Sequence, residues 1–226
     1  SDYLKLVIIQ ENFRLKNSKN STLINKNIFS KLLSKLLKFV NYGAKSLSYN
    51  KNINLVRTQN INEVKKTIEL LKLYEINLLI FIVGKIIDKE IIDYLDGNVI
   101  NIHNGYSPYY KGSNTLFLPI YNSDFDKIGV TVHYATDEVD NGSVIFQKRL
   151  NSFKYLNYDL LFIKSMKYSR DSIFLVLDII LNDFELPSIT HQDKVDKVYF
   201  SKNFTKEIER VIRVKIFKNF INYCLR

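Results

Sequence analysis

An amide, an imidazole and a carboxylate stand near the ends of strand-like runs in the middle of this 226-residue sequence. Asn101 and His103 end an alternating apolar run, and side chains two apart on a strand face the same side, so both can face one pocket. Asp140 follows a second such run that ends at Tyr134. The amide and the imidazole can donate hydrogen bonds to a developing negative charge, histidine can take up a proton near neutral pH, and the carboxylate can fix its tautomer.

Zinc binding is the alternative use of these residue types. His103, His133 and Asp140 would make a three-ligand set, but their spacing matches no zinc pattern, and we expect no metal. His133 lies in mid-strand, where a buried, hydrogen-bonded histidine near Asp140 is the expected role. His191 is expected to be a loop histidine without a function.

The elements that must position these residues alternate between strands and helices. This rhythm predicts an α/β, Rossmann-like, mostly parallel twisted sheet with helices on both faces, in which ligands bind beyond the carboxyl ends of the strands. The expected strands are 3–9, 44–49, 78–83, 99–103, 128–134, 143–147 and 198–200. The expected helices are 21–40, 60–73, 88–95, 157–181 and a last one capped by Asn203 or Thr205.

Composition narrows the class of protein. With 46% hydrophobic residues the chain can bury a full core, and a single cysteine excludes a disulfide framework and suits the reducing cytoplasm. No apolar stretch is long enough for membrane insertion. The net charge of +10 comes from lysines spread along the chain rather than from a basic cluster, so we expect no nucleic-acid partner. We predict a main domain over 1–186 and a short, mainly helical C-terminal extension over 187–226.

Four ordered blocks resemble the formyltransferases that use N10-formyltetrahydrofolate. They read Asn101-Ile-His103, Pro108-Tyr-Tyr-Lys-Gly112, Gly129-Val-Thr-Val-His133 and Asp140-Asn-Gly142. The family transfers a formyl group to an amine through a tetrahedral intermediate. The resemblance implies that Asn101, His103 and Asp140 are catalytic, with Asn101 holding the formyl oxygen and Asp140 assisting proton transfer. Whether His103 is the base or an oxyanion donor stays open.

The resemblance also implies binding residues in the surrounding loops. Folate, the formyl-carrying co-substrate, would contact two loops largely through their backbone: Phe81, Gly84, Ile86, Ile87, Thr136, Asp137 and Val139. The substrate would contact side chains that include cations able to meet a phosphate and tyrosines able to stack: Lys85, Tyr106, Tyr109, Lys111 and Asn114.

Three acceptor branches exist in the family. The position after the first strand reads Gln10-Glu-Asn-Phe13, without the glycine-containing phosphate loop of the glycinamide ribonucleotide branch. Only some forty residues follow the main domain, too few for the appended domain of methionyl-tRNA formyltransferases, and Tyr199-Phe-Ser-Lys202 is similar to a segment of the amino-sugar branch. This favours a nucleotide-linked amino sugar, with TDP-4-amino-4,6-dideoxyglucose the best choice, made for surface polysaccharide (O-antigen). A methionyl-tRNA enzyme and a non-catalytic folate- or nucleotide-binding module are the alternatives, and the branch suggests a homodimer.

Overall fold

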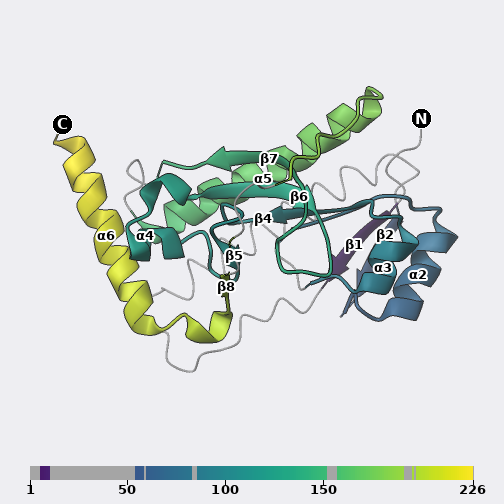
Figure 1. Ribbon diagram of the computed structural model, residues 1–226, viewed down its shortest axis with the longest axis horizontal. Coiled ribbons are helices and arrows are strands. Elements are labelled where there is room, and N and C mark those ends of the chain that lie inside the picture. The colour runs from purple at the N-terminus through teal and green to yellow at the C-terminus, as the bar shows by residue number, and fades with distance from the viewer. Residues whose placement is uncertain are drawn as a thin grey trace. The chain divides into compact units, whose positions relative to one another are not determined.

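The computed structural model describes residues 6–10, 54–58, 60–82, 86–151, 157–190, 195 and 197–225, which fall into two compact units, Ser1–Asn77 and Leu78–Arg226. In the first unit, β1 (Leu6–Gln10) and β2 (Asn54–Thr58) form a parallel pair, and α2 (Val64–Leu73) follows (Figure 1). The predicted strand at 3–9 and helix at 60–73 are confirmed as β1 and α2. The helix predicted at 21–40 and the strand at 44–49 lie outside the described residues, and β2 was not predicted.

The second unit contains a four-stranded sheet in the order β3-β4-β6-β7. Its strands are β3 (Leu79–Ile82), β4 (Val99–His103), β6 (Gly129–Tyr134) and β7 (Val144–Arg149). All four were predicted, and the mixed α/β class is confirmed. Only β3 and β4 are parallel, however, whereas β6 pairs antiparallel with both β4 and β7. The short β6–β7 connection explains the last pairing, because parallel neighbours need a long crossover and antiparallel neighbours need only a hairpin.

Local capping sets where the helices of this unit begin. The side chains of Asp88, Asn157 and Thr205 accept hydrogen bonds from backbone N–H groups in the first turns of α3 (Lys89–Tyr94), α5 (Tyr158–Leu181) and α6 (Lys206–Cys224). These three helices were predicted. The short α4 (Leu118–Asn122) and the 3-10 turns η1 (Phe125–Lys127) and η3 (Ser201–Asn203) were not. None of the helices in the described ranges is long and apolar enough to cross a membrane.

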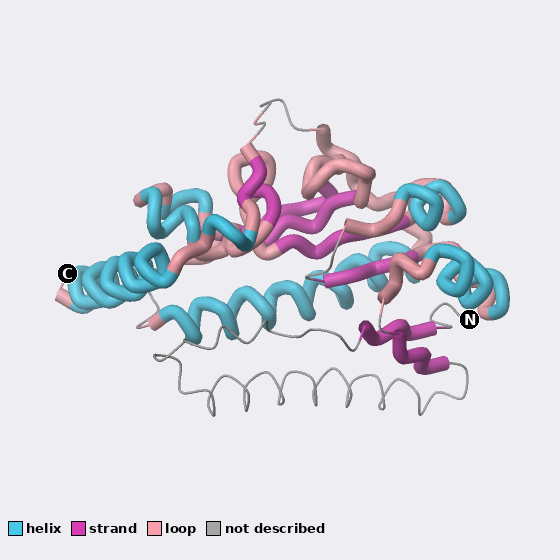
Figure 2. Tube along the Cα trace, turned by 90° about the horizontal axis from the view of Figure 1, so that it is seen from below, coloured by secondary structure: helices cyan, strands magenta, loops and turns pink. Residues whose placement is uncertain are grey.

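The core of the second unit lies between the sheet and α5, which runs along one side of it (Figure 2). Ile100 and Ile102 of β4, Leu161 and Val176 of α5 and Ile216 of α6 are fully buried in one cluster. Three serines of α5 are also buried: Ser165, Ser169 and Ser172. The predicted C-terminal extension therefore contributes to this core through α6, and the proposed boundary at 186/187 stays a prediction.

A second, two-stranded sheet lies beside the main one. In it β5 (Lys111–Gly112), from the loop after β4, pairs parallel with β8 (Val198–Tyr199), from the C-terminal segment (Figure 1). The strand fragment predicted at 198–200 is confirmed as β8. Its partner could not be predicted, because a two-residue pairing carries no periodic pattern.

Candidate active site

Two adjacent segments deliver the three predicted catalytic residues to one place. Asn101 and His103 lie on β4, and Asp140 lies in the connection between β6 and β7, with a left-handed backbone at φ 48°. The Asn101 Nδ2 group donates to Asp140 Oδ1 at 2.8 Å, and Nδ1 of His103 lies 3.3 Å from Asp140 Oδ2. Antiparallel pairing places His133 directly opposite Asn101, so a fourth polar side chain joins the set.

Asp140 is the centre of this cluster. Besides Asn101 and His103, the backbone N–H of Gly112 donates to Oδ2 at 2.8 Å, and Nε2 of His133 lies 3.5 Å from Oδ1. Burial by itself raises the pKa of Asp140, but the two histidines and the Gly112 hydrogen bond lower it more, and the pKa lies below its ordinary value. The carboxyl group is therefore ionised at neutral pH.

His133 fixes the orientation of Asn101. Its Nδ1 lies 2.7 Å from the Tyr134 carbonyl, which can only accept, so Nδ1 carries the ring proton. Nε2, on the other side of the ring, lies 3.1 Å from Asn101 Nδ2, which donates to it. The predicted buried and hydrogen-bonded state of His133 is confirmed, since only 2% of it is exposed. Because both amide hydrogens of Asn101 are used in this way, Asn101 must release one of them to donate to a formyl oxygen.

The buried ring of His103 meets oxygen atoms at both nitrogens. Nε2 donates to the carbonyl oxygen of Tyr110 at 2.9 Å and lies 3.2 Å from Thr115 Oγ1. Burial lowers the pKa of His103, and the charge of Asp140 and the Tyr110 carbonyl only partly oppose this effect. The neutral ring therefore keeps its proton on Nε2, and Nδ1 is the basic nitrogen. A proton taken up there would be stabilised by Asp140, which favours the base role that the sequence left open.

The glycine of the Asp-x-Gly block is required sterically. A Cβ atom on Gly142 would lie 1.8 Å from the Tyr134 carbonyl oxygen, so the β6–β7 connection would have to move. We expect Gly142→Ala to lower the free energy of unfolding by about 2–3 kcal/mol, since overpacking against backbone has no soft neighbour to yield. Gly97→Ala is the matched control. Gly97 has φ 76°, but a Cβ atom there would meet nothing within 4 Å, so we expect the free energy of unfolding to fall by only about 1–2 kcal/mol. Urea unfolding of both variants measures the difference, and equal losses would contradict the steric explanation.

The predicted folate residues that the structure describes lie on β3, just before α3 and in the β6–β7 connection. Phe81 on β3 is half-buried and pairs in register with Asn101, and Ile87 is buried. Thr136 and Asp137 are exposed and Val139 is half-buried in the connection that leads to Asp140. Ile86 is exposed, whereas Gly84 and Lys85 lie outside the described residues.

The predicted substrate residues are only partly brought together. Lys111 is buried and its Nζ donates to Asn141 Oδ1 at 3.1 Å, next to Asp140. Tyr106 instead accepts from Arg149 Nε at 3.2 Å, and the ring of Tyr109 lies under Lys127 Nζ at 4.2 Å. Asn114 has φ 60°, and its carbonyl accepts from the N–H groups of Phe117, the N-cap of α4, and of Leu118, its first residue, so its described role is in the turn.

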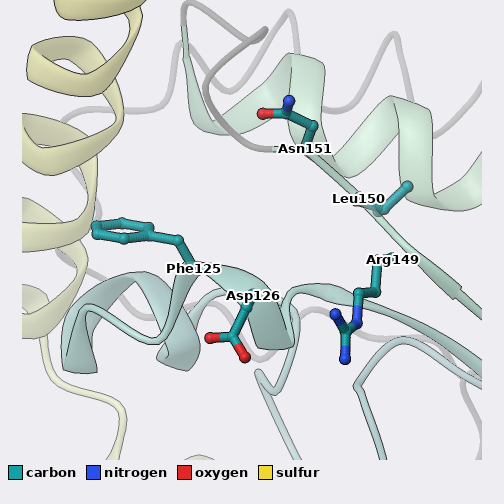
Figure 3. A pocket seen from close by; sticks show the side chains of 5 residues that line it. All are labelled: Phe125, Asp126, Arg149, Leu150 and Asn151. Atoms are coloured by element: carbon teal, nitrogen blue, oxygen red, sulfur yellow. The ribbon is translucent and has the colours of Figure 1, made fainter.

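A hollow of about 460 Å³ lies apart from the cluster. Phe125, Asp126, Arg149, Leu150 and Asn151 line it, and in Figure 3 the side chains of Asp126 and Arg149 point the same way, away from Asn151. None of the three predicted catalytic residues lines it. Within the described part of the chain, no group of three or more His, Cys, Asp or Glu side chains is arranged to hold a metal ion.

Three participating residues were missed or undervalued by the sequence analysis. Tyr110 and Thr115 contact His103, and Gly112 contacts Asp140 through its backbone. Backbone donors and acceptors leave no side-chain signal. Thr115 lies three residues beyond the Pro108–Gly112 block and was not singled out.

Comparisons with known proteins agree with this geometry. A family model described as "Formyl transferase" matches residues 30–159, more than half of the chain. The methionyl-tRNA formyltransferase of Buchnera aphidicola is 28% identical over 139 residues, 61% of this chain, and the chain spans only 44% of that protein's length. The methionyl-tRNA formyltransferase of Fusobacterium nucleatum is 30% identical over 113 residues, 49% of this chain and 36% of that protein.

Two solved structures show the same fold. One is the formyltransferase PseJ from Anoxybacillus kamchatkensis, in complex with UDP-4,6-dideoxy-4-formamido-L-AltNAc and tetrahydrofolate: TM-score 0.59, 19% identity, 80% of this chain and 92% of that chain. The other is a 4-N formyltransferase from Francisella tularensis: TM-score 0.57, 19% identity, 96% of this chain and 88% of that chain. The family match, together with the side chains gathered around Asp140, leads to one conclusion: the chain belongs to the formyl transferase family.

Proposed function

We propose that this protein transfers the formyl group of N10-formyltetrahydrofolate to the amine of a nucleotide-linked amino sugar. The observation that carries the proposal is the carboxylate of Asp140, which contacts Asn101 at 2.8 Å and His103 at 3.3 Å within the matched part of the chain. An amide donor, a base of lowered pKa and an ionised carboxylate are the groups that acyl transfer to an amine requires.

Each side chain has a task in this reaction. His103 takes the proton of the attacking amine on Nδ1, and Asp140 stabilises the imidazolium that forms. Asn101, released from His133 or Asp140, donates to the formyl oxygen as negative charge develops there. Losing one such donor typically costs about 10²–10³ in rate. The reaction requires no metal in this scheme.

The amino-sugar acceptor is the finer part of the proposal. It is supported by the fold shared with PseJ, which was solved with UDP-4,6-dideoxy-4-formamido-L-AltNAc, and with a 4-N formyltransferase. It is also supported by Tyr199-Phe-Ser-Lys202, which begins in β8. Lys111, the one buried lysine next to Asp140 among the described residues, is proposed to face the nucleotide phosphates. Lys85, Tyr106, Tyr109 and Asn114 are the other side chains proposed to contact the substrate. The folate is proposed to lie against Phe81, Gly84, Ile86, Ile87, Thr136, Asp137 and Val139. We propose TDP-4-amino-4,6-dideoxyglucose as the substrate, and the formylated sugar as a precursor of surface polysaccharide. The enzyme is proposed to act in the cytoplasm as a homodimer.

Methionyl-tRNA is the second candidate acceptor. The curated relatives reported above formylate it by name, and the net charge of +10 would favour a polyanion.

A panel of acceptors decides between the two. Purified protein would be incubated with N10-formyltetrahydrofolate and TDP- or UDP-linked 3- and 4-amino sugars, or with methionyl-tRNA, while tetrahydrofolate release is followed. We expect release with one nucleotide sugar and none with methionyl-tRNA. Release with methionyl-tRNA alone would overturn the sugar acceptor, and folate binding without release would point to the non-catalytic module.

A further inference from the structure

The backbone around β5 holds both titratable residues of the proposed reaction. The carbonyl of Tyr110 accepts from His103 Nε2 at 2.9 Å, and the N–H of Gly112 donates to Asp140 Oδ2 at 2.8 Å. These two groups flank Lys111, so any shift of β5 moves the partners of the base and of the carboxylate together. The position of β5 therefore affects how both His103 and Asp140 are held.

Residues almost ninety positions later in the sequence hold β5 in place. β8 pairs with it in parallel, and the N–H of Ser113 donates to the Tyr199 carbonyl at 2.8 Å. The two strands approach so closely that a Cβ atom on Gly112, which has φ 95°, would lie 2.2 Å from the carbonyl oxygen of Tyr199. The aromatic ring of Tyr199 also stacks on that of Tyr110, with centroids 5.4 Å apart and planes at 6°.

Tyr110 is fixed at its far end as well. Its hydroxyl donates to Asp124 Oδ2 at 2.5 Å and accepts from Asn122 Nδ2 at 3.0 Å. Burial, followed by the bond to Asp124, raises the pKa of Tyr110 well above its ordinary value, so the hydroxyl stays protonated and keeps donating. The Tyr110 ring, 2% exposed, thus lies between an anchored hydroxyl and the Tyr199 stack, and its carbonyl is directed to His103.

We propose that Tyr199 is a positioning residue for formyl transfer. Its backbone pairing and its ring hold β5 in place, and β5 in turn holds His103 and Asp140 in the positions that the reaction requires. The proposal rests on the proposed function. It gives the C-terminal segment a part in the chemistry, although no atom of β8 contacts the three predicted catalytic side chains in any interaction described above. A displacement of about 1 Å at a site of this kind can cost about 10²-fold in rate.

The test compares Tyr199→Ala with Tyr199→Phe and with Phe200→Ala. Tyr199→Phe keeps the stacked ring and loses only a hydroxyl 3.5 Å from Asn122 Nδ2. Phe200 is the next residue, is 54% exposed and serves as the matched control. Tyr199→Leu, which keeps apolar bulk without the ring, replaces the alanine variant if that variant fails to fold by circular dichroism.

Two readouts are measured. In steady-state kinetics with the acceptor found by the panel, Tyr199→Ala is expected to lower kcat about 10- to 100-fold with little change in KM. By NMR titration without substrate, the pKa of His103 is expected to rise toward its ordinary value in Tyr199→Ala, because burial is the main cause of its lowering and loosening β5 admits water. Asp140, His133 and Lys111, the titratable groups around this ring, are unchanged in all three variants. Tyr199→Phe and Phe200→Ala are expected to match the wild type in both readouts.

The outcomes separate the two proposals. A wild-type protein that turns over no acceptor contradicts the proposed function, but the NMR titration still tests the coupling between Tyr199 and His103. An unchanged pKa of His103 and unchanged kcat in a folded Tyr199→Ala protein would overturn the positioning role. A fall in kcat that Tyr199→Phe shares would assign the effect to the hydroxyl and overturn the role of the stack.

Discussion

Replacing Asp140 with asparagine is expected to lower kcat/KM for formyl transfer by about 10³, the combined effect of a misplaced base and a weakened donor. The wild-type carboxylate accepts from Asn101 through Oδ1 and from Gly112 through Oδ2, while His103 lies beside Oδ2. An asparagine has one oxygen, so its NH₂ group must face either the Asn101 amide or the Gly112 N–H. It also carries no charge to stabilise a protonated His103.

The same substitution is expected to cost stability. A buried donor left without an acceptor typically costs about 1–3 kcal/mol, and urea unfolding would measure this loss. Glu185→Gln, which neutralises an exposed carboxylate in the same unit, is the control and should change neither activity nor stability. An Asp140→Asn protein within about tenfold of wild-type kcat/KM would contradict the central role of this carboxylate.

Replacing His103 with asparagine is expected to lower kcat/KM by about 10²–10⁴, the typical contribution of a general base. The pH dependence follows from the direction of its pKa shift. The base works unprotonated, and burial lowers its pKa, so wild-type kcat/KM should fall only as the pH drops through a value below about 6.5. The pH–rate profile of the wild type measures this acidic limb, which should be absent from the residual activity of His103→Asn.

Two other histidines serve as controls for this limb. His133 lies next to the same carboxylate, so His133→Gln should lower activity through Asn101 but keep the acidic limb. His191, outside the described residues and without a predicted role, should tolerate asparagine with the profile unchanged. A limb that disappears with His133 rather than with His103 would identify His133 as the titrating base.

The parts of the fold that repeat a pattern were predictable from sequence. The apolar run at 78–83 predicted β3, and the helix expected over 88–95 is present as α3, with Asp88 as its N-cap. Asn101 and His103 could be placed on one side of a strand from the period of two alone. Their meeting with Asp140 was expected from the ordered blocks, and the distances agree with that expectation.

The remaining features depend on contacts between distant segments. The segment 54–58 has only two adjacent apolar residues, and β2 was therefore missed. Antiparallel register, which places His133 opposite Asn101, cannot be read from either strand separately. The pairing of β5 with β8 involves two residues on each side, and its contacts with His103 and Asp140 are made through backbone atoms that every residue type possesses.

The buried serines of α5 limit how this family member can diverge. Ser165, Ser169 and Ser172 recur at helical spacing, so small side chains form the middle of the buried face of α5, between Leu161 and Val176. Ser169 is further bound, because its hydroxyl donates to Asn104, the residue after His103 in the chain. Neutral drift at 165 and 172 is thus confined to side chains of similar volume, whereas drift at 169 must also preserve a hydrogen-bond donor. The sequence of α5 would then be restrained by the reaction as strongly as that of β4, although α5 lies far from β4 along the chain.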